Sequence, residues 1–236
     1  MPSKKRKAPS VIYHEFYNSP DDTVYIRSKD DIYFKANKSK LTRASTFFND
    51  ILDTSGPISC DNDEDHPIEL DFTEKAITAY LDIVSISGSH WINLDYPTCK
   101  EVYAIGHFTM SNKAMETTRT MLGSMIIPLD SWDLLIFASD HNDINLGRSA
   151  LISFGEHELC NDRKALCQKR YTKEDLTFFR NNIEKLRPSW QLALFHCLLD
   201  NGQVTLGLGT YDLQAGFLLR HRENVEDHFN PEKYGG

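Results

Sequence analysis

Residues 23–52 read TVYIRSKDDIYFKANKSKLTRASTFFNDIL, and this stretch decides the fold of the N-terminal half of the chain. Apolar residues alternate with polar or amphipathic ones before and after a polar break at 28–31. A period of two on both sides of a short break predicts a β-hairpin. Asp30-Asp31 would form the turn, because Asp tolerates the left-handed backbone region better than most residues.

Helical spacing begins directly after this hairpin. Ser39 is placed to cap one short helix, and Ser45 is placed to cap a second. A third alternating stretch over 68–72 predicts another strand, and Thr73 can cap the helix that follows it. The expected order is therefore two strands, two short helices, a strand and a longer helix.

Two more helices are expected before residue 126. Thr98, with Glu101 three residues later, has the spacing of a capping box, and a further helix is expected around 113–125. The strands are too few and too clustered for a doubly wound parallel sheet. We therefore predict an α+β domain over 11–125, in which helices cover a small mixed sheet.

The segment 34–48 carries a pattern of aromatic, small and apolar residues that resembles the signature of BTB/POZ domains. The matching core positions, including two on the preceding strand, are Val24, Ile26, Phe34, Ala36, Leu41, Ser45, Phe47 and Phe48. Lys38 also matches, and the resemblance extends over roughly residues 20–125. It implies a protein-interaction core that forms homodimers.

The chain departs from the family pattern at several positions, one of which bears on partners. Asn37 stands where the family usually has His. Ubiquitin-ligase adaptors of this family often carry a hydrophobic-x-Glu motif, and Ile58-Ser59-Cys60 lacks its Glu. A cullin-binding adaptor is therefore an alternative that the motif does not support, and a nuclear transcription cofactor is a second alternative.

An apolar lead-in precedes the first predicted strand. Its members are Val11, Ile12, Tyr13, Phe16 and Tyr17. Such a segment can pack on its own core or exchange with a second subunit, as in dimers of the resembled family. The sequence leaves both arrangements open, and we expect the chain to self-associate.

The C-terminal half shows helical spacing without strand patterns. We predict a helical extension over 126–222, within which 203–222 has no assignable pattern, and a disordered tail over 223–236. Trp132 and Trp190 lie beside apolar helical stripes, which favours core packing over a role as binding hot spots.

The first ten residues are basic and are expected to be disordered. Lys4, Lys5, Arg6 and Lys7 form a candidate nuclear-import signal, or simply a solubilising tail. Subtracting these four charges from the net charge of −8 leaves −12 for residues 11–236, which disfavours binding of nucleic acid by the folded part. No apolar run has the length of a membrane span, so we expect a nuclear or cytoplasmic protein that contacts no membrane.

Candidate chemistry is sparse. The five cysteines are scattered and odd in number, which indicates free thiols in a reducing compartment. His157, Cys160 and Cys167 lack a recognised zinc spacing, and the calcium-like stretch 140–145 has an apolar residue at a ligand position. We expect no cofactor, no metal and no catalytic residues, and therefore a non-enzymatic protein-interaction module.

Overall fold

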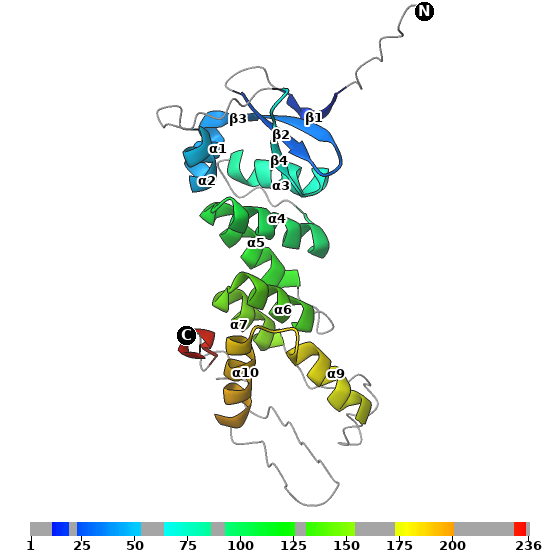
Figure 1. The fold of residues 1–236 in the computed structure, drawn as a ribbon, viewed down its shortest axis with the longest axis vertical. Helices are drawn as coiled ribbons and strands as arrows, with labels where there is room; N and C mark the ends of the chain where they lie inside the picture. The colour runs from blue at the N-terminus through cyan, green and yellow to red at the C-terminus, as the bar shows by residue number, and fades with distance from the viewer. Residues whose placement is uncertain are drawn as a thin grey trace, which may run out of the picture. The chain divides into compact units, whose positions relative to one another are not determined.

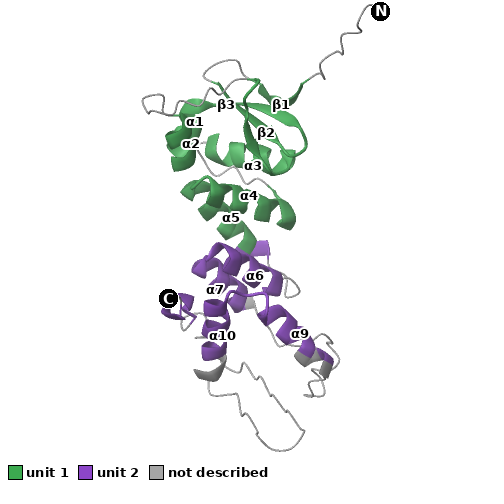
Figure 2. Cartoon of the chain, in the orientation of Figure 1, with its two compact units in different colours: residues 1–122 green, residues 123–236 purple. Residues whose placement is uncertain are grey.

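The structure of the chain is a computed structural model. It describes residues 11–18, 23–52, 64–85, 93–125, 131–153, 173–200 and 229–234. The chain divides into two compact units, 1–122 and 123–236, which Figure 2 shows in different colours. From the sequence, we predicted the boundary between the α+β domain and the helical extension after residue 125. The α+β fold class is confirmed, with a small mixed sheet in the first unit and helices in both (Figure 1).

The elements of the first unit follow the expected order after one additional strand. They are β1 (Ile12–Asn18), β2 (Thr23–Ser28), β3 (Ile32–Asn37), α1 (Lys38–Ala44), α2 (Thr46–Leu52), β4 (Ile68–Leu70), α3 (Glu74–Ser85), α4 (Tyr96–Phe108) and α5 (Asn112–Met125). The strand order across the sheet is β1-β3-β2-β4. β2 and β3 are antiparallel, whereas β1 runs parallel to β3 and β4 runs parallel to β2. Figure 1 shows α3 beneath the sheet, with α4 next along.

The predicted hairpin is confirmed. Ile26 pairs with Phe34, and both side chains are fully buried. The turn places Asp31 at a φ of 61°, and the Ser28 hydroxyl accepts a hydrogen bond from the Ile32 amide at 3.1 Å. The alternating face of the hairpin therefore forms the floor of the core, and α3 covers it with buried residues that we predicted from helical spacing: Ala76, Ile77, Tyr80, Leu81 and Val84.

Two predicted caps were wrong. Asn37, and not Ser39, caps α1: its side-chain oxygen accepts from the Lys40 amide at 3.0 Å. The helix begins two residues earlier than a Ser39 cap would place it, because Asn37 ends β3 in the extended conformation that an N-cap residue typically has. Ser45 does cap α2, accepting from the Phe48 amide at 3.1 Å.

The predicted capping box at the start of α4 was also wrong. Asp95 caps this helix and accepts from the Thr98 amide at 2.9 Å. Glu101 instead reaches out of its helix to Thr73, which lies before α3. Thr73 caps α3 as expected, because its hydroxyl accepts from the Ala76 amide at 3.2 Å.

The described residues of the second unit are helical. The elements are α6 (Ser131–His141), α7 (Ile144–Ser153), α9 (Lys173–Ile183), α10 (Pro188–Asp200) and the short 3-10 helix η3 (Pro231–Tyr234). Trp132 and Trp190 are buried, as predicted.

The tail from residue 223 was expected to be disordered, and this was wrong for 229–234. Phe229 is fully buried, and its ring meets that of Trp190 edge-on, with centroids 5.1 Å apart. Burial of a large aromatic side chain helps to anchor this polar segment, because it removes a large apolar area from water. The unassigned stretch 203–222 lies outside the described residues.

Candidate interaction surface

The signature residues form the core of the first unit rather than its surface. Six of the eight are at most 2% exposed: Val24, Ile26, Phe34, Ala36, Leu41 and Phe48. Ser45 is 3% exposed, and its hydroxyl donates to the Thr109 carbonyl at 2.5 Å. Phe47 is half-buried, and its ring lies 5.0 Å from that of Phe108. Any partner must therefore bind elsewhere.

The apolar lead-in forms β1, at one edge of the sheet. Ile12 pairs with Ile32 and Tyr13 with Tyr33, but the next paired residue is Asn18, opposite Lys35. β1 therefore bulges between residues 13 and 18, where it has more residues than β3. A bulge of this kind changes the direction in which side chains leave an edge strand.

His14 shapes this bulge, and the sequence analysis did not identify it. Its Nδ1 atom accepts hydrogen bonds from the backbone amides of Phe16 and Tyr17, each at 3.2 Å. The ring is 8% exposed and stacks on Phe34, with centroids 4.8 Å apart. On the other side, its Nε2 atom lies 3.0 Å from the Thr78 hydroxyl. A histidine in an otherwise apolar segment was the available signal.

Tyr17 fastens the end of β1 to α3. Its hydroxyl donates to the carboxylate of Asp82. Burial, followed by the hydrogen bond to Asp82, raises the pKa of the Tyr17 hydroxyl well above its ordinary value. Tyr17 therefore stays neutral and donating across the accessible pH range.

β1 and the residue before it leave large apolar side chains in water. Val11 is 40% exposed, Ile12 60% and Phe16 80%. Phe16 projects because the amides of Phe16 and Tyr17 turn inward to His14. The strand is held to the core at His14 and Tyr17, and it presents apolar groups outward at the edge of the sheet that the described strands form.

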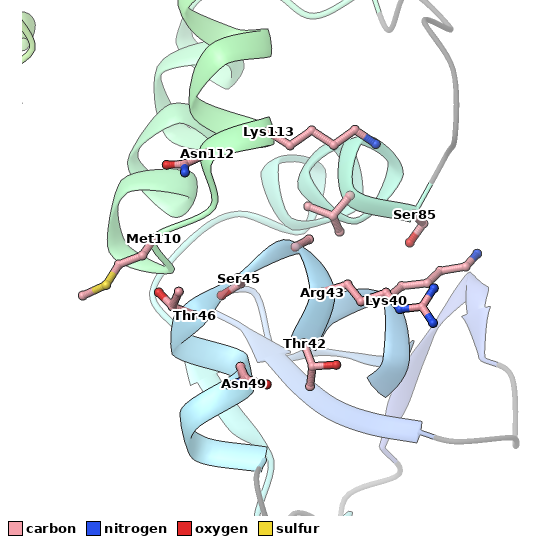
Figure 3. Close-up of a pocket in the computed structure, with 12 residues that line it drawn as sticks. Lys40, Thr42, Arg43, Ser45, Thr46, Asn49, Ser85, Met110, Asn112 and Lys113 are labelled. Atoms are coloured by element: carbon pink, nitrogen blue, oxygen red, sulfur yellow. The ribbon is translucent and has the colours of Figure 1, made fainter.

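A second feature of this unit is a pocket of about 660 Å³ (Figure 3). It is lined by residues of α1 and α2, by the end of α3, and by the loop before α5 together with the start of that helix. Most of its lining residues carry a polar or basic group, and basic side chains from α1 and α5 extend along it in Figure 3.

Other predicted sites fall outside the described residues. These are the basic cluster Lys4–Lys7, the segment 58–60, and the trio His157, Cys160 and Cys167. Within the ranges that the structure describes, no three His, Cys, Asp or Glu side chains are grouped to hold a metal ion. Over those same ranges, no helix has the length and apolar character needed to cross a bilayer.

Comparison with known proteins assigns no family. No protein-family description and no curated protein matches the chain. The chemistry of the surfaces described above is therefore the basis for a functional proposal.

Proposed function

We propose that this chain is a non-enzymatic protein-interaction module that self-associates through β1, on a core of BTB/POZ type. The observation that carries the proposal is the exposure of Ile12 and Phe16 on an edge strand. Edge strands that remain monomeric usually carry charge or proline at such positions, because unpaired backbone groups beside apolar side chains favour association. β1 carries one exposed acid, Glu15, but it also exposes two large apolar groups.

A second copy of the chain is the occupant that fits this edge best. In a two-fold dimer each subunit contributes the same patch, so Ile12 and Phe16 of each copy would be covered by the equivalent patch of the other. The strand is also anchored at His14 and Tyr17, so pairing would not require the edge to become ordered first. The resemblance to a dimer-forming family agrees with this arrangement.

The alternatives are special cases of an interaction module. A cullin adaptor would depend on the segment 58–60, and a nuclear cofactor would depend on Lys4–Lys7. The described part of the chain favours neither, so the proposal is limited to self-association.

Light scattering during size-exclusion chromatography tests the proposed self-association. We expect the folded chain to elute with twice the 27.1 kDa monomer mass at tens of micromolar. Ile12→Asp and Phe16→Asp should each shift it to the monomer, because an apolar contact is replaced by a buried charge. Ile152→Asp is the matched control, since Ile152 on α7 is 59% exposed, like Ile12.

Two results would contradict the proposal. One is a folded wild-type chain that elutes as a monomer. The other is a dimer that survives Phe16→Asp and Ile12→Asp as well as it survives the control. Circular dichroism would confirm that each variant keeps its helices, so that loss of the dimer is not loss of the fold.

A further inference from the structure

The charged side chains among the described residues that line the pocket of about 660 Å³ in the first unit are all basic. Lys40 and Arg43 of α1 and Lys113 of α5 line it, and no Asp or Glu is among the described residues that line it. In Figure 3 all three basic side chains extend toward the side of the pocket on which Ser85 lies. Outside the N-terminal tail this chain is strongly acidic, so the pocket is a local reversal of charge.

Some basic residues elsewhere on this unit pair with carboxylates. Arg27 contacts Glu69, and Lys75 contacts Asp95. By contrast, Lys40 and Arg43 are exposed, and neither forms an ion pair with a carboxylate of the described residues. Lys40 and Arg43 can therefore bind carboxylates that a partner supplies.

We propose that this pocket binds an acidic peptide segment of a partner protein. The planar guanidinium of Arg43 can hold a carboxylate with two parallel hydrogen bonds, and Lys40 adds a second cation one helical turn away. The amide side chains of Asn49 and Asn112 can meet the peptide backbone. The volume lies within the range of sites that enclose a small ligand or a few side chains.

The rim of the pocket adds an apolar contact. Met110 lines the pocket and is 63% exposed. Phe108, on the same turn, is 51% exposed. The peptide should therefore carry an apolar residue beside its acids. Nucleic acid is the less suitable polyanion, because the acidic body of the chain repels an extended phosphate backbone.

Fluorescence anisotropy tests the proposal with a labelled peptide containing Glu-Glu-Leu-Glu-Glu. We expect saturable binding that weakens as salt is added. The double variant Lys40→Gln/Arg43→Gln should bind about tenfold more weakly, since each exposed ion pair contributes up to about 1 kcal/mol. The double variant Lys185→Gln/Lys233→Gln removes the same charge from exposed positions in the second unit and should bind like the wild type.

Two unlabelled competitors test whether the pocket selects an acidic peptide. A peptide with Gln in place of every Glu, and a single-stranded oligothymidylate, should both compete poorly. The proposal fails if the Glu peptide does not bind, if either competitor displaces it as well as unlabelled Glu peptide does, or if both double variants bind equally. Binding should persist in Phe16→Asp, so this result is separate from the outcome of the self-association test.

Discussion

The carboxylate of Glu101 accepts hydrogen bonds from both the backbone amide and the hydroxyl of Thr73, at 3.1 and 2.6 Å. The Thr73 hydroxyl in turn accepts from the Ala76 amide, which starts α3. The other carboxylate oxygen lies 3.7 Å from Nζ of Lys29, in the hairpin turn. One side chain of α4 thus connects the start of α3 with the sheet.

Replacing this carboxylate should destabilise the first unit. We expect Glu101→Ala to lower the free energy of unfolding by about 2 kcal/mol, because it leaves the Thr73 donors without their acceptor. Glu101→Gln should cost less, since its side-chain oxygen can still accept. Urea denaturation measures both. Glu116→Ala, at an exposed position of α5, is the control and should change little; equal losses for Glu101→Ala and Glu116→Ala would show that the link contributes nothing.

His14 should control the bulge of β1. In His14→Leu the amides of Phe16 and Tyr17 lose their acceptor, so we expect their hydrogen exchange to accelerate. In His14→Asn the shorter side chain can still accept from amides two and three residues later, as Asn does in turns, so exchange should accelerate less. Hydrogen exchange of these two amides, monitored by NMR, measures the effect of each variant. Equal rates in both variants would mean that ring packing on Phe34, and not the acceptor, holds the strand.

Two helical glycines should respond to alanine in opposite directions. A Cβ atom at Gly147 would lie 2.5 Å from the Trp190 ring, so Gly147→Ala should destabilise the second unit by about 1–3 kcal/mol through overpacking. At Gly123 the nearest atoms are 3.8 Å away, so Gly123→Ala should be stabilising by up to about 1 kcal/mol through helix propensity. Thermal denaturation compares them. A stabilising Gly147→Ala would mean that the Trp190 ring moves aside without cost.

Cys99 should be chemically inert while the protein is folded. Burial, followed by the nearby Asp95 carboxylate, raises the pKa of its thiol to about 12. The folded state therefore keeps the thiol proton at pH values where the unfolded chain loses it. The stabilisation from the protonated Cys99 thiol is fully present below the ordinary pKa of about 8.5, and it is lost as the pH rises toward 12. At pH about 8, iodoacetamide should leave Cys99 unmodified by mass spectrometry, because the thiolate is the reactive form. The urea-unfolded chain should be modified at Cys99 under the same conditions; rapid modification of the folded chain would contradict the prediction.

Local patterns were sufficient for the hairpin, for the helices and for their buried faces. The alternation through Ile26 and Phe34 needs only that one face of a strand be buried, and this holds in any fold that covers the hairpin. Long helices were predictable for the same reason, since the spacing at Ala76 and Tyr80 is a property of the helix itself.

The edge strand could not be predicted because its pattern is broken by its own bulge. His14 points inward and Phe16 outward, the reverse of what polarity suggests. The reversal depends on Phe34 and Thr78, which lie beside His14 only after the chain has folded. The pocket with the basic lining could not be predicted for a similar reason. Arg43 and Lys113 line it together, although their helices lie far apart in the sequence.

The amino-acid sequence by itself determined which segments became strands and helices in the first unit and which of their faces became core, because hydrophobic burial acts on a periodicity that each segment carries alone. Only the tertiary structure decided which of several competent polar residues capped each helix, and which side chains reached the surface of β1. Asp95 and Thr98 could each have begun α4, and the choice depended on Glu101 finding Thr73 instead. Hydrogen bonds of this kind are decided by the partners that long-range packing brings within about 3 Å.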